Sequence, residues 1–318
     1  MNILITSAGR RVSLIRFAQE TLKRFAPDGK VYAIDMVPDL SAACQIADFY
    51  AKAPRVNDPS YGPFLLNYCI RHTIMLIIPT IDTELSILAD LKASFVDHGI
   101  IIAVSEKSIC DTFYLKSSTF EFFVSNGFNT PRIIADLEHS NYPLFAKLDN
   151  SSCSLGASPV SSYQEASALY RENKSYIFQE LVVGEEYTVD FYLSKAQEPL
   201  AIIPRKRLEV RAGEVSKSIT CKEQNIIKEV KKISKSLQGA WGPMTLQLFK
   251  TSDQKLIFIE INPRVGGGYP LSYHAGMNIF ELMIREMMGE KLTYQESWED
   301  TLTMLRYDAE VLTHANTP

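Results

Sequence analysis

Residues 256–268 read Leu-Ile-Phe-Ile-Glu-Ile-Asn-Pro-Arg-Val-Gly-Gly-Gly and combine reactive side chains with a backbone that a ligand can approach. The apolar start predicts a strand buried on both faces, on which Glu260 and Asn262 project to the same side. A carboxylate beside an amide carbonyl suits Mg²⁺, which prefers to bridge substrate phosphates. A proline then ends the strand, Arg264 offers a planar fork for phosphate or carboxylate, and Gly266–Gly268 admit a ligand. A strand end with a chance polar pair is the competing interpretation.

The composition restricts the class of protein. A chain of 318 residues with 46% hydrophobic residues predicts two or three modules, each with its own core. The formal charge of -4 and the scattered basic residues argue against nucleic acid or an anionic membrane as the main partner. The apolar runs are too short to span a bilayer, and the chain opens with a strand rather than a leader, so we expect a soluble, cytoplasmic protein. The cysteines are too dispersed for zinc or disulfides and are expected to be small core residues: Cys44, Cys69, Cys110, Cys153 and Cys221.

The first third of the chain alternates strands and helices. Strands are predicted at 3–6, 31–34, 75–78 and 100–104, which indicates a doubly wound parallel sheet. A dinucleotide site with Asp35 on a ribose is disfavoured, because the first turn has the single glycine Gly9 instead of G-x-G-x-x-G. Asp82 and Glu84 follow the third strand, where ligands collect in open α/β sheets, and could hold a substrate amine. Helix capping by Asp82 is an equal alternative.

The pattern changes near residue 110. We predict domains at 1–110, 111–183 and 184–318, and this division rests on the change in pattern alone. Predicted helices cover 113–126, 164–173, 225–237 and 279–288, and the predicted strands are 144–148, 176–182, 186–193, 200–204, 244–250 and 304–311.

Six motifs follow one another in an order that resembles the ATP-grasp superfamily. They come after a doubly wound domain and are Asp111–Lys116 before a helix, Asn126–Pro131 at its end, Pro143–Lys147, Phe178–Tyr187, Thr245–Phe249 and Ile259–Arg264. The nearest resemblance is to the carbamoyl-phosphate-synthase-like and D-alanine-ligase-like carboxylate–amine ligases, over roughly residues 1–290. It implies a pre-ATP-grasp domain (1–110), a small lobe (111–183) and a large lobe (184–318).

The resemblance implies roles for the residues of an ATP site. Lys116 and Lys147 resemble the cations that hold the α- and β-phosphates, and lysine suits phosphate as a compact charge. Glu180, Leu181 and Val182 match the hinge that pairs with the adenine edge, with the Glu180 carboxylate accepting from the exocyclic amine. Glu186 resembles the acid that binds the ribose hydroxyls. The neighbouring Glu185 is the alternative inward-facing acid, although strand alternation separates the two.

A metal set and an oxyanion group complete the resemblance. Gln247, Glu260 and Asn262 match the ligands of two Mg²⁺ ions, with Mn²⁺ as a substitute, and Glu260 would bridge the two metals. Arg264 would steady the acyl-phosphate oxyanion or the substrate carboxylate. Residues 205–217 form a basic segment on a predicted loop. Similar loops in the family close over the γ-phosphate.

Further residues are candidates at the two ends of this site. In the basic segment, Arg205 and Lys217 are the expected catalytic groups, with a solvated loop as the alternative. Residues 149–156 have less glycine than the family's phosphate-covering loop, which indicates a variant lid. Gly267 and Gly268 would adjoin the substrate. His274, in a helix-entry loop, would line the acceptor pocket unless it is structural.

These features predict an ATP- and Mg²⁺-dependent ligase that activates a carboxylate as an acyl phosphate for attack by an amine, or by a thiol. Its partners would be a small-molecule carboxylate and amine, and homodimers are common among such enzymes. An ATP-binding module without turnover, used for regulation or scaffolding, is the main alternative. An NAD-dependent oxidoreductase is a weaker one.

Overall fold

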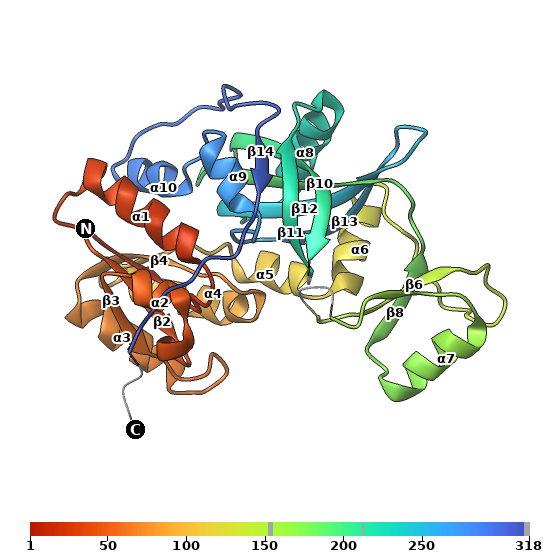
Figure 1. The fold of residues 1–318 in the computed structure, drawn as a ribbon, viewed down its shortest axis with the longest axis horizontal. Helices are drawn as coiled ribbons and strands as arrows, with labels where there is room; N and C mark the ends of the chain where they lie inside the picture. The colour runs from red at the N-terminus through yellow and green to blue at the C-terminus, as the bar shows by residue number, and fades with distance from the viewer. Residues whose placement is uncertain (152–154, 212, 315–318) are drawn as a thin grey trace.

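The computed structural model describes residues 1–151, 155–211 and 213–314, and within these ranges the strands form three sheets (Figure 1). The first is a parallel sheet in the order β3-β2-β1-β4-β5. Its strands are β1 (Asn2–Ile5), β2 (Val31–Asp35), β3 (Phe49–Lys52), β4 (Ile74–Ile78) and β5 (Ile101–Ile102). The accompanying helices are α1 (Val12–Phe25), η1 (Pro38–Leu40), α2 (Ala42–Ile46), α3 (Tyr61–Arg71) and α4 (Asp82–Val96).

The N-terminal strands are apolar at successive positions because helices cover both faces of the sheet. Ile3 and Ile5 of β1 belong to the core cluster that contains the apolar side chains of α1. Leu4 lies between them in sequence but packs into a separate cluster with Leu65 of α3 and Leu88 of α4. Successive strand residues point to opposite faces, so this arrangement confirms the predicted doubly wound sheet.

The second sheet is small and antiparallel. Its order is β7-β6-β8, and its elements are β6 (Leu144–Leu148), β7 (Ser158–Val160), α7 (Tyr163–Glu172) and β8 (Tyr176–Glu180). Leu144, Ala146 and Phe178 form a core of their own with Val160 and Ala166. In Figure 1 this lobe stands apart from the rest of the molecule, at the right of the view.

The third sheet is antiparallel and has the order β13-β12-β9-β10-β11-β14. Its strands are β9 (Glu185–Leu193), β10 (Pro199–Arg211), β11 (Glu214–Thr220), β12 (Gly242–Lys250), β13 (Leu256–Asn262) and β14 (Thr303–Leu305). The helices of this region are α5 (Lys107–Tyr114), α6 (Lys116–Ser125), α8 (Gln224–Ser236), α9 (Tyr269–His274) and α10 (Ile279–Met287). A parallel sheet followed by a two-lobed antiparallel region confirms the predicted fold class.

Three local predictions were wrong. The basic segment expected as a loop is the β10–β11 hairpin, because β10 pairs with both β9 and β11 and is buried continuously from Leu200 to Arg205. The strand that ends at Asn262 is not buried on both faces: Leu256, Phe258 and Ile261 are buried, whereas Glu260 and Asn262 are only half-buried. The helix predicted over 113–126 is divided at the extended residue Leu115 into α5 and α6.

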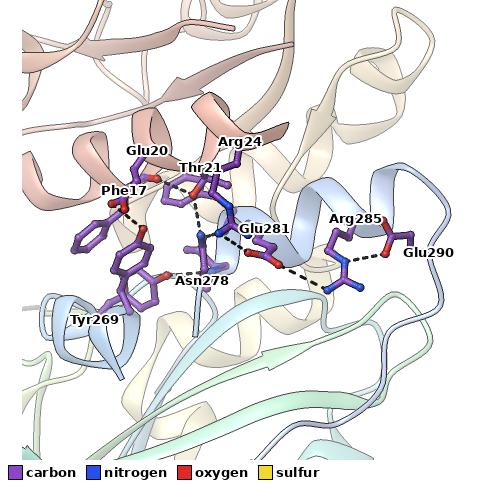
Figure 2. Close-up of polar contacts among 12 residues, drawn as sticks. Phe17, Glu20, Thr21, Arg24, Tyr269, Asn278, Glu281, Arg285 and Glu290 are labelled. Atoms are coloured by element: carbon purple, nitrogen blue, oxygen red, sulfur yellow. Dashed lines mark hydrogen bonds and ion pairs between the residues drawn. The ribbon is translucent and has the colours of Figure 1, made fainter. Parts of the chain in front are cut away.

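A joint between α1 and the helices α9 and α10 connects the N-terminal sheet to the large sheet (Figure 2). Phe17 of α1 stacks on Tyr273 with ring centroids 3.7 Å apart. The Asn278 amide nitrogen donates to the Thr21 hydroxyl at 2.8 Å, and Arg24 lies 3.3 Å from a Glu281 carboxylate oxygen. Because α9 begins directly after Gly268, this joint also fixes the glycine segment relative to the first sheet.

Among the described helices, none has both the length and the apolar character needed to cross a membrane.

Candidate functional site

A cavity of about 650 Å³ is lined by residues of both antiparallel sheets and by the segment that follows β4 and begins α4. Fourteen of the predicted site residues contribute to its wall, although they come from segments far apart in the chain. They are Asp82, Lys116, Lys147, Glu180, Leu181, Val182, Glu186, Arg205, Gln247, Glu260, Asn262, Arg264, Gly267 and Gly268.

The predicted metal ligands meet on two neighbouring strands. Gln247 of β12 lies directly opposite Glu260 of β13 in the antiparallel register, and Asn262 follows on the same side of β13. The Asn262 amide nitrogen donates to Glu260 Oε1 at 3.0 Å. Within the described residues, no three His, Cys, Asp or Glu side chains gather as a metal cage. Oxygens from a bound phosphate would therefore have to complete the coordination of a metal at Glu260 and Asn262, as Mg²⁺ prefers.

Two ammonium groups face this oxygen pair. Lys147 is 6% exposed, and burial lowers its pKa to about 8, while the nearby Glu260 carboxylate opposes that shift. Lys116 is the first residue of α6, and its ammonium donates to the backbone carbonyls of Asp149 and Ser151. Burial also lowers the pKa of Lys116, again against the attraction of Glu260. A buried ammonium is costly without a counter-charge, so both lysines suit an anionic ligand.

The hinge residues also line the cavity. The Glu180 carboxylate accepts from Arg132 Nε at 2.8 Å and from the Arg132 backbone nitrogen at 3.1 Å. The Arg132 guanidinium lowers the pKa of Glu180 and already occupies the carboxylate expected to accept from an adenine amine. Leu181 and Val182 follow β8 without regular structure and line the cavity, where their backbone groups can meet a planar ligand.

Strand alternation on β9 separates the two adjacent glutamates. Glu186 lines the cavity and accepts from Arg207 Nη1 at 2.5 Å, whereas Glu185 faces solvent and pairs with Lys206 at 2.5 Å. Burial raises the pKa of Glu186, and the Arg207 guanidinium opposes this shift. Glu186, which the sequence analysis favoured over Glu185, is therefore the acid that faces the cavity.

Arg205 lies beneath the glycine segment rather than on a closing loop. Its side chain is fully buried, and Nε donates to Asp190 Oδ2 at 2.8 Å. Among the described residues, its Nη1 and Nη2 atoms have no hydrogen-bond partner. A Cβ added at Gly268 would lie 2.4 Å from Arg205 Nη1, so only glycine fits against the guanidinium. Orphaned buried donors are costly, and they indicate a place where an anion would be stabilised.

Arg264 is held by Asp82, the first residue of α4 in the N-terminal region. Its Nε donates to Asp82 Oδ1 at 2.7 Å and its Nη2 donates to Asp82 Oδ2 at 2.6 Å. Parallel hydrogen bonds of this kind are the strongest carboxylate contact that a guanidinium makes. Asp82 therefore neither caps its helix through its side chain nor waits free for a substrate amine.

Three predicted site residues do not line the cavity. Glu84 is fully buried and accepts from the Thr80 and Ile81 backbone nitrogens at 2.7 and 3.2 Å, so it caps α4. His274 is the last residue of α9 rather than part of a loop, is exposed, and packs edge-on against Phe17. Lys217 is exposed on β11 and pairs with Glu209 at 2.7 Å.

A variant lid was predicted at 149–156, and residues 152–154 of that segment lie outside the described ranges. These residues include Cys153, so the prediction that it is a core cysteine also lies outside them.

Several cavity residues were missed by the sequence reasoning. Arg207 Nη1 lies 3.3 Å from Gln247 Oε1 and bridges that residue to Glu186. It stands two positions after Arg205 on one strand, so alternation within the basic segment could have identified it. Glu214 also lines the cavity and accepts from Arg306 at 3.0 Å. Arg306 donates to the Gly267 carbonyl as well, and nothing in the sequence links these three positions.

Comparison with known proteins agrees with this arrangement. Residues 3–103 match the family model described as "PylC-like, N-terminal domain", and residues 172–309 match "ATP-grasp in the biosynthetic pathway with Ter operon". No curated protein matches the chain.

Solved structures share the fold over most of the chain. An L-amino acid ligase from Bacillus licheniformis is 19% identical, with a TM-score of 0.69 over 90% of this chain and 73% of its own. The biotin carboxylase domain of a Hydrogenobacter thermophilus 2-oxoglutarate carboxylase, a dimer with MgADP, ADP and bicarbonate, is 15% identical, with a TM-score of 0.73 over 95% and 73%. A Staphylococcus aureus N5-carboxyaminoimidazole synthetase with ADP is 16% identical, with a TM-score of 0.72 over 92% and 78%.

Proposed function

We propose that the chain is an ATP- and Mg²⁺-dependent ligase of the ATP-grasp superfamily that activates a carboxylate as an acyl phosphate for attack by an amine. The observation that carries this proposal is the convergence of two cations, an oxygen pair and a guanidinium fork on one cavity. These groups are Lys116, Lys147, Glu260, Asn262 and Arg264. Phosphoryl transfer depends on positioning and charge neutralisation, which this set supplies.

Each residue has a distinct task in the proposal. Lys116 and Lys147 bind the α- and β-phosphates, and backbone groups at Leu181 and Val182 pair with the adenine edge. Because Arg132 occupies the Glu180 carboxylate, we assign no adenine contact to that side chain. Glu186 accepts from the ribose hydroxyls. Its partner Arg207 holds the carboxylate in place.

The metal and oxyanion groups act at the other end of the nucleotide. Glu260 and Asn262 fit Mg²⁺ together with phosphate oxygens, and Gln247 is the further ligand if two ions bind. The metal, Mg²⁺ or Mn²⁺, supplies charge neutralisation at the transferred phosphoryl group. Arg264 orients the substrate carboxylate, and Arg205 stabilises negative charge beneath Gly268. A cavity with both metal and oxyanion groups favours turnover over ATP storage alone.

The domain boundaries and the oligomeric state are also proposals. We propose that residues 1–110, 111–183 and 184–318 are the structural units, and that the protein works in solution as a homodimer. The similar biotin carboxylase domain from Hydrogenobacter thermophilus is a dimer, which supports the second proposal. Light scattering on the purified chain tests the dimer, and a monomeric mass at micromolar concentration contradicts it.

ADP release with pooled carboxylic acids and amines tests the ligase. We expect release that requires Mg²⁺ and both pools, and that is lost in Glu260→Gln. Glu185→Gln is the matched control, because Glu185 is an exposed carboxylate that faces away from the cavity. If ATP binds but no acid and amine release ADP, and Glu260→Gln binds ATP as the unaltered protein does, a non-catalytic nucleotide module replaces the ligase.

A further inference from the structure

The first sheet ends in an exposed edge strand. β3 pairs with β2, and within the described residues no strand covers its other edge. Phe49 and Tyr50 are 51% and 42% exposed, and as successive residues they place aromatic rings on opposite faces of the strand. In Figure 1 β3 lies at the end of the molecule opposite to the small lobe. Natural sheets usually cover or charge such an edge, because it is a template for pairing with another chain.

The turn beside β3 enlarges this apolar surface. Met36 and Val37 lead into η1, Leu40 ends it, and η1 packs beside β3. All three side chains are exposed, Leu40 to 87%. The Phe49 ring is held in place by stacking on Tyr32, with ring centroids 5.0 Å apart. Neighbouring exposed apolar side chains of this kind mark surfaces at which proteins associate.

The sequence of β3 and its preceding residue is complementary to itself. Residues 48–52 read Asp-Phe-Tyr-Ala-Lys. When two copies of this segment pair in antiparallel register about Tyr50, Asp48 of each copy lies opposite Lys52 of the other, and Phe49 lies opposite Ala51. Directly opposite residues share a face of the sheet. A carboxylate therefore meets an ammonium, and a large ring meets a methyl group, each of them twice.

The two charged groups are available for this pairing. Lys52 is exposed and, across the part of the chain that the structure describes, it pairs with no carboxylate. Asp48 is also exposed, and its Oδ2 accepts from the Val31 backbone nitrogen at 2.8 Å. This hydrogen bond fixes the carboxylate beside the edge of the sheet and leaves Oδ1 to accept from an ammonium.

We propose that two copies of the chain associate through β3, in antiparallel register about Tyr50, and join their first sheets into one continuous sheet. A dimer with a two-fold axis uses the same surface on both copies, which a self-complementary strand provides. This interface rests on the homodimer proposed above and says which surface forms it. Among the described residues, none of β3 or η1 lines the cavity, so the interface is separate from the ATP site.

A cysteine at the two-fold axis tests the register. Opposite Cα atoms in an antiparallel pair lie about 4.5–5.5 Å apart, within the span of a disulfide. Tyr50→Cys should therefore form a covalent dimer when it is oxidised with diamide, and dithiothreitol should reverse it. Tyr170→Cys is the matched control, because Tyr170 is a similarly exposed tyrosine on α7 of the small lobe. The unaltered protein, oxidised in parallel, controls for the five native cysteines.

Charge reversal tests the same interface without a new cysteine. Lys52→Glu places like charges opposite each other twice, so the dimer dissociation constant in sedimentation velocity should rise about tenfold, and most at low salt. Lys228→Glu is the matched control, because Lys228 is an exposed lysine on α8. Both variants should bind ATP as the unaltered protein does, since neither residue lines the cavity.

The outcomes distinguish the interface from the rest of the proposal. A monomeric mass for the unaltered protein at micromolar concentration overturns both the interface and the homodimer, and the ligase, which ADP release tests, still stands. A dimer whose folded Tyr50→Cys variant cross-links no faster than Tyr170→Cys overturns the interface alone. If circular dichroism shows that Tyr50→Cys is unfolded, Lys52→Glu decides, and a dissociation constant equal to that of Lys228→Glu overturns the interface.

Discussion

Raising the pH through 8 should weaken ATP binding, because the Lys147 ammonium loses its proton there. Burial lowers the pKa of this lysine to about 8, even though Glu260 attracts the charged form. Phosphate oxygens favour the ammonium, so the pKa with ATP bound lies above that of the free protein. The contribution of such a group to affinity is fully present below the free pKa and is lost as the pH rises through it.

The size of the effect follows from the two pKa values. With a free pKa near 8 and a bound pKa raised well beyond this pH range, the affinity should fall about tenfold between pH 7 and pH 9, or about 1.4 kcal/mol. Calorimetric titration of Mg·ATP over this range measures it, because the terminal phosphate, with a pKa of about 6, stays ionised.

The matched control is Lys147→Arg, whose guanidinium stays charged throughout. Its affinity for ATP should be flat over the same range. If Lys147→Arg loses affinity as steeply as the unaltered protein, the titration belongs to another group and the reasoning on Lys147 is refuted. Lys116, whose pKa burial also lowers, is then the group to test by Lys116→Arg.

Three further changes separate the roles that the geometry assigns. Arg207→Met should weaken ATP binding about tenfold or more, because the Glu186 carboxylate loses the guanidinium that holds it. Lys217→Met changes the exposed side of the same hairpin and should leave both the ATP affinity and ADP release unchanged. Gly268→Ala places a methyl group 2.4 Å from a buried guanidinium, and steady-state kinetics should show a large loss in kcat/KM with ATP affinity retained in calorimetry. Glu84→Ala should lower the free energy of unfolding by about 2–4 kcal/mol, because buried backbone donors lose their acceptor, and Glu84→Gln should lose less in denaturant titrations.

The sequence predicted the apolar framework well where burial alone determines structure. Four strands of the first sheet, β1, β2, β4 and β5, were found because helices cover both faces and nearly every position is apolar. The edge strand β3 was missed, since Phe49, Tyr50 and Lys52 are exposed and show no alternation. Edge strands need tertiary pairing to form, and that pairing leaves little trace in local composition.

The basic segment shows how a charged composition can conceal a strand. Arg205 and Arg207 face the cavity, and Lys206 between them points outward to Glu185. Charged residues in succession were interpreted as a loop, although their period of two is that of a strand. The buried partner of Arg205 is Asp190 on the adjacent strand β9, and it is this contact that makes a buried arginine tolerable.

Contacts that form only through tertiary packing could not be predicted at the Arg264 end of the site either. Spacing on one strand was enough to place Glu260 and Asn262 side by side, because a strand fixes the direction of alternate side chains. No such rule links Asp82 to Arg264, since 182 positions separate them, one at the start of α4 and the other just after β13. They meet because the joint of α1 with α9 and α10 docks the first sheet against the glycine segment. The contact between Asp82 and Arg264 therefore depends on tertiary packing, whereas the oxygen pair of β13 follows from a short sequence motif.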